Sequence, residues 1–203
     1  MKKPKRWLFV SVSAAFLLVG IFYVVKIYGF NLQHPIGKEI DNLNGVAVYY
    51  NGPVSNVSGR HLTADGYNLG LKYQCVEFVK RYYYEHYQHK MPNSYGHAKD
   101  FFDGQIQDGQ FNTQRALYQY TNPSQSKPMP GDLLIFDGHP SNIYGHVAII
   151  SNVAENEIEI IQQNPGKQGK SRKRIPLLQQ SDKWQIDNGR ILGWLRKKEK
   201  EPP

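Results

Sequence analysis

The chain has 203 residues, with 25 Lys and Arg against 17 Asp and Glu. Five of the basic residues lie within positions 1–30, which contain no acid, so the rest of the chain lacks the concentrated positive charge typical of nucleic-acid-binding proteins. The 40% apolar and 13% aromatic content excludes a disordered chain, and the single cysteine excludes an internal disulfide.

The first long apolar segment, residues 7–25, contains no charged residue. At a rise of 1.5 Å per residue it nearly spans a hydrocarbon core of about 30 Å, so it predicts one uncleaved transmembrane helix, a signal anchor. A cleaved signal peptide is the alternative, although the small residues stand in the middle of the segment and not at its end. Four basic residues precede the segment, which predicts a cytoplasmic tail over 1–6 and places the chain beyond about Phe30 outside the cytoplasmic membrane.

The remaining chain predicts one globular domain over 44–197, because no repeat or low-complexity linker divides it. A tether over 26–43 would precede this domain, and a charged tail over 198–203 would follow it. Glycine and asparagine residues bracket a short predicted strand at 46–50.

The segment 73–87 predicts the best helix of the domain. Its apolar residues recur at spacings of three and four and form a stripe, with most of the charged residues elsewhere; the stripe consists of Val76, Val79, Tyr83 and Tyr87. A weaker helical segment follows near 96–103.

The second half of the domain predicts adjacent strands, at 128–138, 145–153, 157–163 and 190–197. Asn156 suits the tight turn of an antiparallel hairpin between the second and third of them. Helices first and strands afterwards favour an α+β fold with helices on one side of an antiparallel sheet.

Cys75 lies in the first turn of the predicted helix. Cysteine attacks as the thiolate, and the N–H groups at a helix N-terminus favour that anion, so Cys75 is a candidate nucleophile. A lone cysteine can equally be a small buried apolar residue. His146 follows Gly145 at the start of an apolar strand, where its ring can emerge at a sheet edge and act as a general base.

An imidazole base needs a partner that orients its ring, and the strand at 157–163 offers several polar side chains. These are Glu159, Gln162, Gln163 and Asn164. The histidines show no HxH or HxxxH spacing, so the sequence predicts neither a metal site nor a cofactor.

Five segments together resemble the CHAP family, the cysteine- and histidine-dependent amidohydrolases and peptidases of papain-like fold. They are YQCVEFVKRYY, GDLLIFDG, GHVAIISNV, IIQQN and ILGWL, in the family's order, and the likeness as a whole runs from about Gly45 to Leu195. Within the family, the amidase domain of the glutathionylspermidine synthetase/amidases is the most similar. The resemblance implies a papain-like α+β domain that needs no metal or cofactor.

The resemblance also implies roles for individual residues. Cys75 would be the nucleophile and His146 the general base. The Cys75 amide and a group of Tyr73 or Gln74 would form the oxyanion hole.

Three further positions follow from the same resemblance. Gln162 stands where the glutathionylspermidine amidases have a catalytic glutamate, and an amide can also orient the ring, although it stabilises an imidazolium less. Arg81 and Asn164 match positions near the substrate channel and are expected to contact substrate.

Three functions are open at this point. The first is a membrane-anchored cysteine amidohydrolase that cleaves the peptides of peptidoglycan, with residues 7–25 in the bilayer. The second is hydrolysis of glutathione–polyamine conjugates such as glutathionylspermidine. The third is a catalytically weak CHAP module that binds an envelope polymer, suggested by Gln162 and by the basic residues within 167–174. No nucleic-acid partner is expected.

Overall fold

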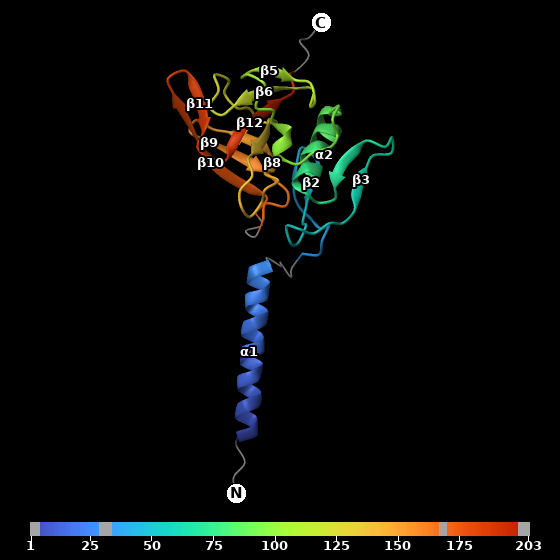
Figure 1. The fold of residues 1–203 in the computed structure, drawn as a ribbon, viewed down its shortest axis with the longest axis vertical. Coiled ribbons are helices and arrows are strands. Elements are labelled where there is room, and N and C mark those ends of the chain that lie inside the picture. The colour runs from blue at the N-terminus through green and yellow to red at the C-terminus, as the bar shows by residue number, and fades with distance from the viewer. Residues whose placement is uncertain (1–4, 29–33, 167–169, 199–203) are drawn as a thin grey trace.

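The computed structural model describes residues 5–28, 34–166 and 170–198, and Figure 1 shows how their helices and strands are arranged. In chain order the elements are α1 (Lys5–Tyr28), β1 (Glu39–Leu43), β2 (Val46–Tyr49), β3 (Arg60–Leu62), β4 (Asn68–Leu71), α2 (Cys75–Tyr87), the 3-10 turn η1 (Lys99–Phe101), β5 (Gln110–Asn112), β6 (Leu117–Thr121), β7 (Leu133–Phe136), β8 (His146–Val153), β9 (Glu157–Ile161), β10 (Arg172–Gln180), β11 (Lys183–Ile186) and β12 (Ile191–Arg196).

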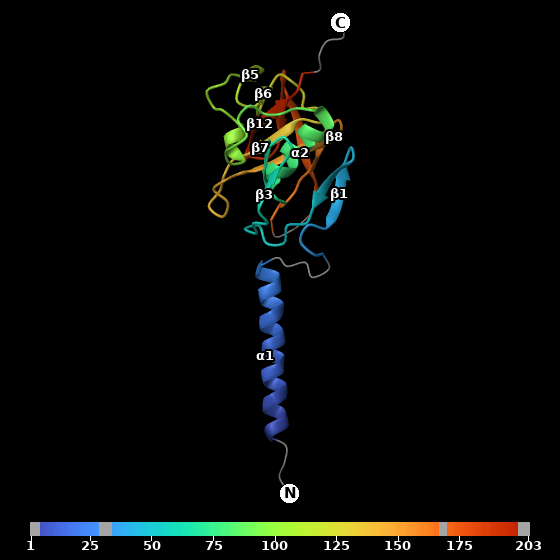
Figure 2. The ribbon, with the colours of Figure 1, turned by 90° about the vertical axis from the view of Figure 1, so that its right-hand side faces the viewer.

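Helix α1 lies apart from the strands in both views (Figures 1 and 2). Its large apolar side chains between positions 16 and 24 are each 50–73% exposed. Within the described part of the chain, no helix has the length and apolar character needed to cross a membrane. The transmembrane segment predicted over 7–25 falls partly on side chains that the structure does not describe, at 5–12 and 25–28, and it stays a prediction.

Eight strands form one antiparallel sheet in the order β11-β10-β9-β8-β7-β12-β6-β5. The mixed helix-and-antiparallel-sheet fold is therefore confirmed. Strands β8 and β9 form the predicted hairpin, closed by a hydrogen bond from the Ala154 N–H to the Glu157 carbonyl. The four predicted strand segments of the second half correspond to β7, β8, β9 and β12, and each observed strand is shorter than its prediction.

Both faces of this sheet are buried, which explains the continuous apolar runs in its central strands. Alternate residues of β7 enter two separate clusters: Leu133 and Ile135 pack with α2, whereas Leu134 and Phe136 pack on the other face. The second cluster is enclosed because the sheet curls. Trp184 on the edge strand β11 forms a β-bridge with Ser124, just beyond β6. The β11 edge of the sheet therefore curls round toward the end that carries β6.

Helix α2 covers the first of these faces, next to β8 (Figure 2). It begins two residues later than predicted and ends at Gln88, whose left-handed backbone (φ 50°) lets its N–H bond the Tyr83 carbonyl. The side of the helix that carries most of its charged residues is buried as well as the apolar stripe. Glu77, Lys80 and Arg81 are all at most 3% exposed, because the hairpin of β3 and β4 covers the second side of the helix.

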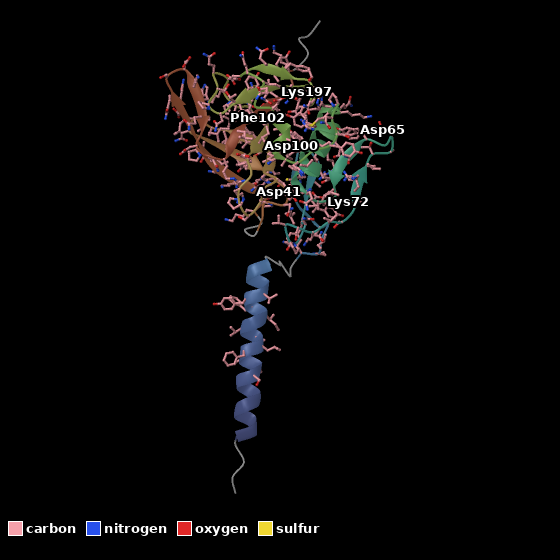
Figure 3. The ribbon with its side chains drawn as sticks, in the orientation of Figure 1. Asp41, Asp65, Lys72, Asp100, Phe102 and Lys197 are labelled. Atoms are coloured by element: carbon pink, nitrogen blue, oxygen red, sulfur yellow. The ribbon has the colours of Figure 1, made fainter. Side chains whose placement is uncertain are left out.

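The N-terminal part of the domain extends further than expected. Residues 26–43 were assigned to a tether, but β1 pairs with β2, and Ile40 and Leu43 pack against the core. Asp41, labelled in Figure 3, binds Arg172 and Ser171 and so fastens β1 to β10. Arg172 is therefore taken up by structural contacts, and residues 167–169 of the basic run lie outside the described residues.

Short or polar strands escaped the sequence analysis. These are β1, β3, β4, β5, β6, β10 and β11. The weaker helix predicted near 96–103 is only the single turn η1. Of the predicted tail at 198–203, all but residue 198 lies outside the described residues.

Candidate active site

Cys75 is the first residue of α2 and is half-buried. The chain reaches it through a tight approach from β4: Gly70 (φ 131°) lies so close to the helix that a Cβ there would stand 3.2 Å from the Glu77 amide nitrogen. Tyr73 then takes a left-handed conformation (φ 67°), and Gln74 caps the helix in an extended one. This sharp turn presents the thiol at the helix N-terminus, where the first N–H groups have no intrahelical partner.

His146 opens β8, and the neighbouring backbone links it to the nucleophile. The amide of Val147, the next residue, lies within hydrogen-bonding reach of the Cys75 sulfur and lowers the pKa of that thiol. Cys75 therefore lies against the backbone of β8 directly after His146, and the roles of these two residues as nucleophile and base stay predictions. Gly145 makes the entry to the strand with a left-handed backbone (φ 75°).

Gln162 contacts the imidazole of His146 through its side chain. Its side-chain N–H donates to the Lys170 carbonyl (3.2 Å), which turns its Oε1 toward His146 Nε2 at 3.0 Å. An amide oxygen can only accept, so the ring nitrogen Nε2 carries the proton and donates. Nδ1 is then the unprotonated nitrogen that can accept a proton from the thiol.

Burial controls the resting charge of both reacting groups. It raises the pKa of the Cys75 thiol, more than the amides of Val147 and Val76 lower it. It lowers the pKa of His146 to about 4, against the opposing hydrogen bond from Gln162. At neutral pH the site therefore rests as a neutral thiol beside a neutral imidazole, and His146 has to act as a general base during attack.

Adding a methyl group at Gly145 tests the entry to β8. We expect Gly145→Ala to lower the free energy of unfolding by at least about 2 kcal/mol, because alanine resists the left-handed backbone and its Cβ would lie 2.5 Å from the Phe136 carbonyl oxygen. Urea denaturation measures the change. The control is Gly189→Ala, where no atom lies within 4 Å of the added Cβ, and equal losses in the two variants would contradict the expectation.

The lowered pKa of His146 predicts a pH-dependent stability. Between pH 6.5 and 4 the unfolded chain binds a proton at this residue that the folded chain does not, so stability falls as the pH is lowered through this window. The contribution is up to about 3 kcal/mol. Denaturation curves of the wild type and of His146→Gln isolate it, since the variant should lose this part of the slope; identical slopes would contradict the assignment.

A carboxylate in place of the orienting amide should reverse the shift. In Gln162→Glu we expect the pKa of His146 to rise from about 4 toward its ordinary value of 6.5, because a negative charge beside Nε2 favours the imidazolium. An NMR titration of the ring protons measures it. Gln162→Met, which has neither charge nor acceptor, serves as the control and should leave the pKa low.

The oxyanion hole differs from its prediction in one respect. Both donors of Gln74 are already used: its backbone N–H binds the Leu71 carbonyl, and its side-chain amide binds the carbonyls of Val54 and Asn56. The Tyr73 hydroxyl is turned toward Gly37. The donor that the fold leaves at the thiol is the backbone N–H of Cys75, at the start of α2.

The two residues expected to contact substrate hold the structure together in other ways. Arg81 is 3% exposed and pairs with Glu77 (2.7 Å), which does not fit a role in substrate binding. Asn164 is half-buried, and its side-chain amide donates to the Val54 carbonyl (3.0 Å) and to Gln74 Oε1 (2.6 Å). It therefore fixes the loop beside the nucleophile.

A buried polar network below Cys75 was missed from sequence. The Glu77 carboxylate is bonded by Arg81 on the same helix, by His61 of β3 and by the fully buried Gln163, which follows β9. The only sequence signal was the pair Glu77 and Arg81 at a spacing of four, which is ordinary on an exposed helix face. Among the residues that the structure describes, no cluster of histidine, cysteine and carboxylate side chains could hold a metal ion.

Residues 65–164, which include Cys75, His146 and Gln162, match the sequence pattern of the CHAP domain. This segment is similar to the CHAP family. The positions of Cys75 and His146 agree with this match, and the match supports a hydrolase that acts on amide bonds through a cysteine.

Curated relatives support the same family. The chain is 30% identical over 138 residues to the bifunctional glutathionylspermidine synthetase/amidase of Escherichia coli (strain K12), covering 63% of this chain and 22% of that protein. It is 29% identical over 107 residues to the trypanothione synthetase of Crithidia fasciculata, covering 53% of this chain and 16% of that protein. The chain thus spans only about a fifth of the length of these relatives.

One solved structure is also similar in part. It is described as the crystal structure of Ly7917, with 17% sequence identity and a TM-score of 0.34, and the match covers 62% of this chain and 53% of that one.

Proposed function

We propose that this CHAP domain hydrolyses peptide amides of peptidoglycan, held at the outer side of the cytoplasmic membrane by its N-terminal helix. The observation that carries the chemistry is the hydrogen bond from His146 Nε2 to Gln162 Oε1, because it leaves Nδ1 unprotonated and able to take a proton from Cys75. A cysteine with such a base can transfer an acyl group without a metal.

The reaction proceeds in two steps. Cys75 attacks the carbonyl carbon while His146 Nδ1 takes the thiol proton, and the oxyanion forms at the Cys75 N–H. The imidazolium then protonates the leaving amine, which gives a thioester on Cys75. A water molecule, deprotonated by His146, attacks the thioester; the acid leaves and the thiol is restored.

Two features support an envelope location. Four basic residues precede the apolar segment 7–25, whereas residues 31–203 hold 20 basic against 17 acidic residues, which favours a domain outside the cytoplasm. The apolar side chains of α1 between 16 and 24 are exposed on the isolated chain, and a lipid bilayer would cover them. Peptidoglycan is the large amide-containing polymer on that side of the membrane.

The relatives favour a second candidate, hydrolysis of a glutathione–polyamine conjugate. It is supported by the 30% identity to the glutathionylspermidine synthetase/amidase over 138 residues. The order of the two candidates would reverse if the domain lay in the cytoplasm.

One experiment separates the candidates. The full chain is incubated with purified peptidoglycan and, in parallel, with glutathionylspermidine, and the products are analysed by mass spectrometry. New amine and carboxyl ends in the wall peptides, absent with Cys75→Ala, are the expected result. Release of spermidine alone would favour the second candidate, and no cleavage of either would favour a catalytically weak binding module.

A further inference from the structure

Two consecutive glutamines directly after β9 face opposite sides, one toward His146 and the other toward the N-terminus of α2. Gln162 holds the His146 ring. Gln163, which has no exposed surface, turns the other way and lies against the N-terminus of α2. The strand end therefore contacts the base through one side chain and the element that carries the nucleophile through the next.

The contacts of Gln163 use both hydrogens of its amide group. Its Nε2 donates to the Gln74 carbonyl at 3.0 Å and to Glu77 Oε2 at 2.8 Å. Its Oε1 accepts from the Tyr49 N–H at 2.7 Å. No other natural side chain of this length can donate twice and accept once in this arrangement, since glutamate lacks the donors and methionine lacks both.

These partners surround Cys75 in the chain. Gln74 directly precedes the nucleophile, and its carbonyl also begins the helix by accepting the Phe78 N–H. Glu77 lies in the first turn, two residues after the nucleophile. A side chain that binds on both sides of Cys75 fixes the backbone of that turn, and with it the position of the sulfur.

We propose that Gln163 is a positioning residue for amide hydrolysis, which holds the first turn of α2 in register with the His146–Gln162 pair on the neighbouring strands. The inference rests on the proposed function, because in it Gln163 sets the distance between nucleophile and base without contacting either of them. It acts through Gln74 and Glu77, and it does not contact substrate.

The test measures whether the increase in Cys75 reactivity caused by His146 depends on Gln163. Because Cys75 is the only cysteine, iodoacetamide labelling of the full chain reports on it alone. Rates are measured at one neutral pH for the wild type, His146→Ala, Gln163→Met and the double variant. Gln179→Met, at an exposed position on β10, is the matched control.

In the wild type, His146→Ala should slow the labelling of Cys75 at least about fivefold. In a chain that already carries Gln163→Met, adding His146→Ala should change the labelling rate less than about twofold. The control should keep the full effect of His146. If Gln163→Met lowered the labelling rate by the same factor with His146 present and with His146 replaced, Gln163 would be only structural and the inference would be overturned. If Gln163→Met does not fold, as judged by circular dichroism, Gln163→Asn is held to the same criterion, since it shortens the side chain but keeps the amide.

The result also separates the inference from the function on which it rests. No effect of His146→Ala in the wild type would overturn the proposed function, whatever Gln163 does. A clear effect in the wild type that persists unchanged in Gln163→Met would overturn the inference alone.

Discussion

Replacing His146 by alanine should lower kcat for amide hydrolysis by about 10²- to 10⁴-fold. The loss is large because the site rests as a neutral pair: burial keeps the Cys75 pKa high, so without a base the thiol is seldom ionised when the substrate arrives. KM should change little, since the ring acts on the thiol proton. The measurement is a steady-state assay with the substrate that the wild type cleaves.

The control for this variant is His86→Ala, which removes an exposed histidine from the last turn of α2. It should retain nearly full activity. A His146→Ala variant with activity within threefold of wild type would mean that another group deprotonates Cys75, and the assignment of the base would be wrong.

Replacing Arg81 by methionine should cost about 3–5 kcal/mol of folding stability. Arg81 and Glu77 are both nearly inaccessible, and Arg81 also binds the Ala47 carbonyl and lies over the Tyr49 ring. Removing the guanidinium leaves a buried carboxylate without its main counter-charge. Urea denaturation of both proteins gives the difference.

A surface pair of the same residue types provides the comparison. Arg174 binds Glu157 with its side chain 69% exposed, and Arg174→Met should cost less than about 1 kcal/mol. Adding Glu77→Gln to Arg81→Met should restore part of the lost stability, because it removes the unpaired charge. Equal costs at the two arginines would contradict the claim that burial makes the Glu77 pair different.

The places of the candidate site residues in the fold could be predicted from sequence because each has a distinctive local setting. Cys75 opens a helix, His146 opens an apolar strand, and Gln162 directly follows the strand β9 that pairs with it. Helix and strand periodicity locate such elements, and the order of the conserved segments of the family brings them together.

The supporting contacts could not be predicted, because they depend on partners far away in the sequence. A helix with charges at Glu77, Lys80 and Arg81 has the pattern of a half-exposed surface helix. Only the docked hairpin of β3 and β4 makes these positions interior, and its short strands give almost no periodic signal. The same limit applies to Gln163, whose partners Tyr49 and Gln74 lie about 114 and 89 residues away.

The burial of Cys75 has a consequence for how long the protein stays active. Peroxide and disulfides react with thiolates, and a cysteine whose pKa is raised is rarely ionised between turnovers. The same burial that makes attack depend on His146 therefore slows the oxidation of the sulfur. A domain that works in oxidising surroundings can in this way carry its only cysteine as the reactive group without a reducing partner to restore it.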